Sequence, residues 1–468
     1  MRKFIYSALI LCAMTPLHQV QDQDYSFSQA WQKLLSVNNT LVAERENTAK
    51  AKAKKKAARS LYGPEISVSA RYLYLDDDVV LEAEDVLDNM ADGGESLKNL
   101  ATTIGSLTGN SIDINNFDTT LADQSTLTSS LTAIWPVYTG GRVSAAQDIA
   151  QGQYLEAVQH QNLVKRQQFA ELAKRYFGVV FAEQVYQTRR KVELGLGQHV
   201  KDAILLEREG QIAKVERLQA TASRDKARVE RKSSEHTLAI ARNALATILN
   251  DKDFPIPVDS LFYNKELPPL ETFIKRTVNN FAGLGILKSK KEQAQGMVNV
   301  EKGTYLPEVA VLGNYSIYED ESLATDVAPD WFVGINVSFT LFDRNGRADK
   351  LQAARSSVRQ VNALIAQAET DITLLCEQFY RKALQAREEY EGFASGIELA
   401  KEGLNLRQKA FAQGLSTSLD VVDAELFLAG MQIRRSQSQY NYVIALSQLL
   451  SLTGEVESFG HYQEMAVR

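Results

Sequence analysis

The sequence predicts a mainly α-helical fold with a membrane β-barrel part, built from a duplicated unit of helix, strand, strand, long helix and helix. Residues 142–250 and 346–454 contain no proline and are rich in Ala, Leu, Glu, Gln, Lys and Arg, a composition that favours long helices. Four shorter segments alternate apolar and polar residues, which is typical of strands with two different faces. The same order of motifs occurs twice along the chain, which predicts the duplication.

The N-terminus has the pattern of a secretory signal peptide, which we assign to residues 1–21. A basic start at residues 1–3 is followed by an apolar run that ends at Met14. Leu11 precedes Cys12 and is larger than the small residue of a lipoprotein signal, so we do not expect lipidation. No later run approaches about 18 uncharged apolar residues, and we therefore expect an exported chain without a transmembrane helix.

Two halves of the chain repeat each other. The segment YGPEISV at 62–68 returns as YLPEVAV at 305–311, and Gly210 and Gly414 hold matching places in the two halves. Chance similarity between two Ala-rich helical regions would not reproduce both Pro-Glu strand starts. We predict a first structural repeat over 22–250, a proline-containing linker over 251–269, a second structural repeat over 270–455 and a C-terminal tail over 456–468.

Each repeat is predicted to begin with a helix, over 26–61 and over 270–304, that ends near a proline. The alternating segments that follow are about 10–12 residues long, which is enough for a tilted strand to cross hydrocarbon. They are predicted as strands at about 64–75, 126–138, 307–318 and 331–342.

A half-buried sheet of a soluble protein would show the same alternation. Two observations favour the membrane: the export signal, and aromatic residues near the strand ends, where membrane proteins carry aromatic girdles. These predicted membrane-interface residues are Tyr72, Tyr74, Trp135, Tyr138 and Trp331.

Four strands are too few to close a barrel around a lumen, and open strand edges are not tolerated in lipid. Several subunits must therefore pool their strands. A helix over 142–209 would be roughly 100 Å long at 1.5 Å per residue, so it must pack along its length against similar helices. An end that bears strands and a long bundle or barrel of helices is the architecture that these lengths predict.

Three motifs carry a resemblance to a known family. The segment FAQGLSTSLDVVDAE at 411–425 is similar to an aromatic-x-x-Gly turn followed by Asp-Val-Leu-Asp-Ala, PVYTGGR at 136–142 looks like a strand-to-helix corner, and SQYNY at 438–442 fits a last helix. In this order and spacing they resemble the TolC-like outer membrane efflux protein family, from about Tyr25 to Glu455.

The resemblance implies a homotrimer in which a shared twelve-stranded β-barrel joins a trimeric α-helical barrel. It implies an outer-membrane channel with a large periplasmic portion and outer-membrane lipid around it. A periplasmic adaptor protein and an inner-membrane transporter would be its partners, in efflux or in type I protein secretion. Such proteins hydrolyse nothing themselves, so no enzyme activity is expected.

Asp420 and Asp423 are the predicted periplasmic gate and selectivity residues. They lie three residues apart and so share one side of a helix. The resemblance implies that they ring a constriction, where carboxylates from three subunits would repel one another and attract cations. The alternative is helix capping, with Ser416 or Thr417 as the cap and acidic residues complementing the helix dipole.

Gly210 and Gly414 are predicted to form the helix turns at the periplasmic tip, because glycine adopts a positive φ at little cost. Glu216 is the counterpart of Asp420 in the first half, and we expect it to take part in polar contacts that hold the tip closed. Some family members carry a basic residue where this chain has Ser416. The sequence therefore does not identify the contacts that close the tip.

The loop between the first two strands, 76–125, contains a long acidic segment: residues 76–95 carry nine Asp or Glu and no Lys or Arg. We expect an extracellular solvated loop, helical over part of 81–107, with shielding of the outer mouth or Ca²⁺ binding as alternatives.

Several classes of function find no support. The five histidines show no metal-ligand spacing, so no metal site or cofactor is expected. No phosphate-binding loop or nucleophile elbow is present, and a net charge of −6 argues against nucleic acid as a partner. The remaining alternative to a channel is an exported coiled-coil scaffold protein without a pore, which would not need four membrane-length strands.

Overall fold

The computed structural model of the chain describes residues 24–82, 91–108, 119–251, 255–320 and 328–467. The expected signal peptide and part of the acidic loop lie outside these residues. The chain divides into two compact units. We call them the helical unit (Met1–Lys50, Leu155–Lys288 and Ala363–Arg468) and the sheet unit (Ala51–Tyr154 and Ser289–Asn362).

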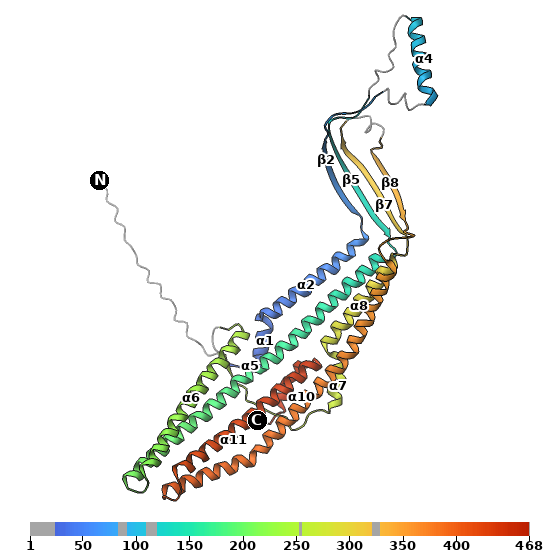
Figure 1. Cartoon of the computed structure of the whole chain (residues 1–468). Coiled ribbons are helices and arrows are strands. Elements are labelled where there is room, and N and C mark those ends of the chain that lie inside the picture. Colours follow the sequence, from blue (N-terminus) through green and yellow to red (C-terminus); the bar gives the residue numbers. More distant parts are fainter. Residues whose placement is uncertain (1–23, 83–90, 109–118, 252–254, 321–327, 468) are drawn as a thin grey trace, which may run out of the picture. The chain divides into compact units, whose positions relative to one another are not determined.

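Two helical hairpins dominate the helical unit, each made of a very long helix that turns back into a shorter one (Figure 1). The prolines that would interrupt such helices are absent from these segments. The hairpins are α5 (Arg142–Arg208) with α6 (Lys214–Ile248), and α10 (Arg347–Ala412) with α11 (Ser418–Thr453). The first residues of α5 and α10 belong to the sheet unit.

Shorter elements complete this unit. They are β1 (Asp24–Tyr25), which pairs in parallel with β6 (Ile256–Pro257), and helices α1 (Phe27–Val37), α2 (Asn39–Arg59), α7 (Leu270–Asn280), α8 (Ala282–Gly303) and α12 (Phe459–Glu464). The parts of α2 after Lys50 and of α8 after Lys288 belong to the sheet unit.

We expected single helices over 26–61 and 270–304, and this expectation was wrong. Each of these segments forms two helices separated by one residue. Asn38 and Phe281 have extended backbone angles and separate α1 from α2 and α7 from α8. At the first break, Asn38 Oδ1 accepts a hydrogen bond from Leu41 N at 3.1 Å, which caps the start of α2. Asparagine favours this local bond over continuing the helix, a competition that apolar periodicity does not reveal.

An aromatic cluster forms the core where α1, α5 and α12 meet. Phe27 lies 5.5 Å from Phe169 and 4.7 Å from Phe459 between ring centroids, and 5.5 Å from Tyr176. All four side chains are at most 3% exposed. This packing fixes the N-terminal helix and the C-terminal helix against α5, because buried aromatic rings contribute more contact area than other side chains.

The sheet unit contains four antiparallel strands in the order β2-β5-β7-β8. These are β2 (Glu65–Tyr74), β5 (Ser125–Tyr138), β7 (Glu308–Glu319) and β8 (Trp331–Ser338). The last strand stops at Ser338 and not at 342 as expected, because Ser338 pairs with Glu308, the first residue of β7. Beyond this point β7 offers no backbone partner.

Pro136 lies inside β5, a strand with neighbours on both sides. The pairing of β5 with β2 reaches only Ile134, so Pro136 takes no place in that ladder. On the other side the register with β7 shifts between Pro136 and Tyr138. A missing N–H is thus accommodated at a bulge beyond the end of the neighbouring strand.

The segment between β2 and β5 is more structured than a plain solvated loop. It contains β3 (Val79–Leu81), which pairs with β4 (Thr119–Ala122), and the helix α4 (Ala91–Thr108). In the part of the chain that is described, no helix is both long and apolar enough to cross a lipid bilayer.

Candidate functional site

The register of the four-stranded sheet places apolar residues of all four strands on one face. Directly opposite residues of antiparallel strands point to the same side. One row across the sheet runs from Val68 to Leu131, Tyr315 and Trp331. We call this side the apolar face; it also holds Ile66, Ala70, Tyr72, Leu127, Ala133, Trp135, Val309, Val311, Gly313, Val333, Ile335 and Val337.

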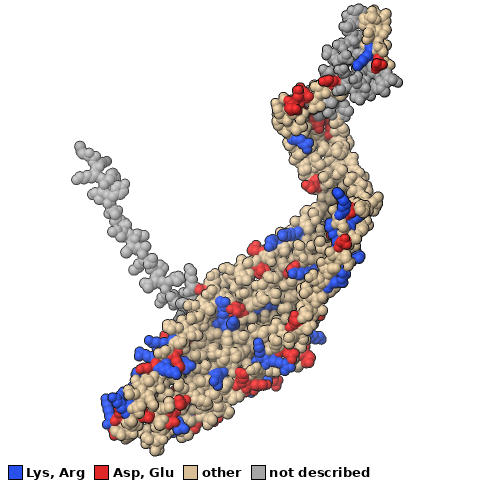
Figure 2. Space-filling view, in the orientation of Figure 1, with Lys and Arg blue, Asp and Glu red and all other residues tan. Residues whose placement is uncertain are grey.

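The other side, which we call the polar face, carries many short hydroxyl and amide side chains together with the apolar residues Leu73, Ile134, Leu312 and Phe332. Ser69 Oγ lies 3.1 Å from Ser130 Oγ, and Asn314 Nδ2 donates to Thr132 Oγ1 at 3.1 Å. The four strands carry few charged residues, and Figure 2 shows little charge over them on the face in view. The charged residues of the four strands are Glu65, Arg71, Glu308 and Glu319. A sheet with one apolar and one hydroxyl-lined side suits a wall between lipid and water.

The apolar face is exposed. Val68 and Val333 are each 68% exposed and Ile335 is 72% exposed. Within the described residues, β2 and β8 are the edges of this sheet, and each has a pairing partner on one side only. An exposed apolar sheet with two open edges is incomplete as it stands, because such edges pair readily with further strands.

The predicted interface aromatics fall at the two ends of the strands. Tyr72 and Tyr74 end β2, and Trp331 begins β8 at the opposite edge of the sheet, in the row of Val68. Trp135 and Tyr138 end β5, which runs antiparallel to β2. The ten residues of β2 span about 33 Å at ~3.3 Å each. At a tilt of about 45° this projects to roughly 23 Å, close to the apolar band of a membrane barrel.

In the helical unit, both hairpin turns use the same glycine cap. Gly210 and Gly414 have φ of 73° and 70°. The next residue of each turn donates back to the helix: Gln211 N to Leu206 O, and Leu415 N to Ala410 O, both at 2.9 Å. This pattern closes a helix end with a residue in the left-handed conformation, which glycine adopts without strain.

The first turn of α11 is closed by Thr417 and Asp420. Thr417 Oγ1 accepts from Asp420 N at 3.2 Å, and Asp420 Oδ2 accepts from Thr417 N at 2.9 Å. Ser416 Oγ also donates to this carboxylate at 3.1 Å, and Arg407 Nη1 lies 3.6 Å from its Oδ1. Hydrogen bonds from the Thr417 side chain and backbone hold the pKa of Asp420 below its usual range. Asp420 is therefore a capping residue here, while Asp423 is exposed three residues further on.

Glu216 acts across the two hairpins. The α6 N-cap is Ala213, whose methyl side chain cannot accept a hydrogen bond from the first turn of its own helix. Glu216 Oε2 instead accepts a hydrogen bond from Ser418 N at 2.6 Å, on the first turn of α11. A carboxylate at this place also complements the positive end of the α11 dipole. The two acidic counterparts, Glu216 and Asp420, thus close the same helix end from two sides.

His199 is part of this contact, and sequence reasoning missed it. Its ring is 5% exposed, its Nε2 lies 2.7 Å from Ser418 Oγ, and its centroid lies 4.4 Å from that of Phe411. Burial lowers the pKa of His199. No sequence signal links His199 to Ser418, because the two residues are far apart in the chain and belong to different hairpins. Together His199, Glu216, Phe411, Thr417, Ser418 and Asp420 form what we call the tip contact.

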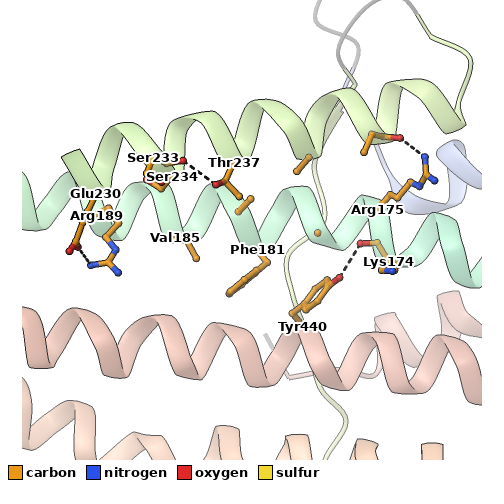
Figure 3. Close-up of a pocket in the computed structure, with 14 residues that line it drawn as sticks. Lys174, Arg175, Phe181, Val185, Arg189, Glu230, Ser233, Ser234, Thr237 and Tyr440 are labelled. Atoms are coloured by element: carbon orange, nitrogen blue, oxygen red, sulfur yellow. Dashed lines mark hydrogen bonds and ion pairs between the residues drawn. The ribbon is translucent and has the colours of Figure 1, made fainter. Parts of the chain in front are cut away.

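A groove of about 510 Å³ opens between α5, α6 and α11 of the helical unit (Figure 3). The rings of Phe181 and Tyr440 stack across it at 5.5 Å, and Tyr440 Oη donates to Lys174 O at 3.3 Å. At one end Arg189 forms an ion pair with Glu230. Because these charged and hydroxyl groups already have partners, the groove offers apolar contacts to a packed helix more readily than a site for a charged ligand.

Groups that could bind a metal ion or act as a nucleophile are a separate feature from these contacts. Among the described residues, no group of three or more His, Cys, Asp and Glu side chains is placed to hold a metal ion. Cys376 is a buried free thiol whose Sγ accepts from Thr277 Oγ1 at 3.6 Å.

Comparison with known proteins places these features in context. Residues 287–455 match the family model described as outer membrane efflux protein. Protein CyaE of Bordetella pertussis is 25% identical over 267 residues, which cover 56% of this chain and 56% of that protein. The chain thus matches this curated relative over only about half of the relative's length.

Solved structures share the fold at low identity. A membrane protein from Pseudomonas aeruginosa superposes with a TM-score of 0.74 at 14% identity, covering 92% of each chain. The outer membrane protein VceC from Vibrio cholerae gives 0.71 at 13% identity, covering 92% of this chain and 96% of that one. The outer membrane channel MtrE of Neisseria gonorrhoeae gives 0.69 at 17% identity, covering 94% and 93%.

Proposed function

We propose that the chain is a subunit of an outer-membrane export channel, because its residues 287–455 match the outer membrane efflux protein family, which confirms the predicted resemblance. The family is one of channel proteins and not of enzymes. In this proposal three chains pool their sheets into a twelve-stranded barrel, which is joined to a barrel of α-helices. Substrates pass outward without chemical change, in efflux or in type I protein secretion.

One observation carries the proposal: the sheet has an exposed apolar face, a polar face and two open edges. A lone four-stranded sheet of this kind would leave backbone donors and acceptors unpaired in lipid, each at a cost of several kcal/mol. Edge-to-edge pairing of β8 with β2 of the next copy removes this cost and encloses the hydroxyl-lined side. Three copies make a barrel wide enough for a water-filled lumen.

A matched pair of substitutions on β8 tests whether the apolar face meets lipid. Ile335 lies on the apolar face and Asn336, its neighbour, on the polar face. An arginine on the lipid side near the midplane costs about 2–4 kcal/mol per copy, whereas one that faces a lumen costs little. We expect Ile335→Arg to reduce the trimer recovered from outer membranes and Asn336→Arg to leave it unchanged. Equal recovery of the two variants, or a wild-type protein soluble without detergent, would favour the scaffold without a pore.

We also propose that the acidic residues of α11 select cations at the periplasmic end. The tip contact allows this to be separated from capping, because Asp423 stands outside the capping box and Thr417 inside it. Asp423→Asn removes one carboxylate per subunit and keeps the cap. Thr417→Ala removes the capping hydroxyl and keeps both carboxylates. In planar bilayers we expect Asp423→Asn to weaken cation preference and block by multivalent cations, and Thr417→Ala to keep both. The opposite result would assign the cation preference to the cap.

A periplasmic adaptor and an inner-membrane transporter complete the proposed assembly. Energy for transport is spent at the inner membrane, since the chain offers no nucleotide-binding motif. Cross-linking in whole cells followed by mass spectrometry identifies both partners. Recovery of the trimer with no periplasmic or inner-membrane protein would argue against this part of the proposal.

A further inference from the structure

We propose that α4 binds the α4 helices of the other two subunits through a stripe of four large apolar residues, and so forms a parallel three-helix contact between copies of this chain. The stripe consists of Leu97, Leu100, Ile104 and Leu107. This inference rests on the proposed trimer and concerns a surface outside the four-stranded sheet.

The stripe is exposed along the described part of α4. Leu97 is 43%, Leu100 55%, Ile104 39% and Leu107 80% exposed. The spacing of three, four and three residues places all four side chains on one side of the helix. It is also the a and d spacing of a coiled coil, the arrangement in which one helix packs against another of the same period.

A neighbouring side of α4 is less exposed than the stripe. Ala101 is 8% exposed, and Lys98 and Gly105, which share its side of the helix, are half-buried. This side of the helix is therefore less accessible than the adjacent stripe, whose four side chains are all exposed. A contiguous exposed apolar stripe marks an interaction surface.

Charge favours a second copy over an anionic lipid surface as the occupant. A helix that lies on such a surface presents several Lys or Arg around its apolar side. Lys98 is the one cationic residue in α4, against the acidic residues Asp92 and Glu95. The acidic run 76–78 precedes β3 in the same segment and would add repulsion from anionic headgroups.

The contact needs the trimer to hold it together. The stripe spans less than two heptads, and helices this short do not associate stably by themselves. Subunits joined through their sheets raise the effective concentration of the three helices at each other's surface. Rotational symmetry gives the three helices the same direction along the axis, so that in such a contact the same residue of each copy lies at the same height.

Cysteine cross-linking of the full-length protein in detergent tests the proposal. Leu100→Cys places a thiol on the stripe, and Thr102→Cys places one on the other side of the helix, where the residue is also exposed. Cys376 is buried and is kept in both variants, and the wild-type protein, which also contains it, is the control. Under mild oxidation we expect Leu100→Cys to give a covalent two-chain species, limited to about two thirds of the chains because three thiols make one disulfide. The Thr102→Cys protein should give no covalent two-chain species.

The oligomeric state of each unoxidised protein in detergent distinguishes the possible results. A Leu100→Cys trimer that does not cross-link overturns the α4 contact and leaves the proposed channel intact. Single chains in detergent for both variants and for the wild type overturn the trimer and the α4 contact together. An environment-sensitive dye on the Leu100→Cys thiol checks the lipid alternative. A blue shift that appears only in vesicles of lipopolysaccharide and phosphatidylethanolamine, with no cross-link, assigns the stripe to the membrane surface.

Discussion

Removing the Glu216 carboxylate should loosen the tip contact. Glu216 Oε2 accepts from Ser418 N at 2.6 Å and is the group that satisfies this first-turn donor of α11. A hydrogen bond to a charged group contributes about 1.5–3 kcal/mol, and the partial exposure of Glu216 places this bond near the lower value. Glu216→Ala should therefore cost about 1.5 kcal/mol of local stability, which corresponds to a roughly tenfold larger opened population. Glu216→Gln keeps an acceptor and should cost about half as much.

Hydrogen exchange of the assembled protein measures this opening. We expect the amides of 411–425 to exchange roughly tenfold faster in Glu216→Ala, because exchange follows the opened population when reclosing is fast. Glu235 is the matched control, since it lies on the same helix and pairs with Arg231 on the surface. Glu235→Ala should leave 411–425 unchanged. Equal exchange at 411–425 in the two alanine variants would refute the argument that Glu216 closes α11.

Two further predictions concern the same end of the hairpins. Burial lowers the pKa of His199 below 6.5, although the carboxylates of Asp202 and Glu216 oppose the shift, so the opened state takes up a proton first as the pH falls. The tip contact should be fully stable above about pH 6.5 and lose protection below it. His199→Gln should remove this pH dependence of the protection factors, which compare the measured exchange rates with the intrinsic rates at the same pH. Gly414→Ala meets no atom within 4 Å but must adopt a φ of 70°, so it should cost about 1–2 kcal/mol and lower the unfolding temperature of the tip, whereas an unchanged melting curve would contradict the strain.

Much of the fold followed from local properties of the sequence. Residues 142–208 form one helix because nothing in the segment breaks it, and Gly210 and Gly414 mark both turns because they alone meet the backbone demand of those positions cheaply. Alternation located four strands, since the side-chain period of a strand is local. The breaks at Asn38 and Phe281 were missed. The break at Asn38 depends on a local hydrogen bond of its side chain to Leu41 N, which periodicity does not reveal.

The sequence by itself determined the long helices, the four strands, the duplication and the family resemblance, all of which depend on neighbours in the chain. The tertiary structure decided which residues meet. Strand register placed Val68, Leu131, Tyr315 and Trp331 in one row, and hairpin packing brought Glu216 and His199 to Ser418. Such pairings join residues far apart in sequence, and their free energy comes from burial and hydrogen bonds that exist only once the chain has folded.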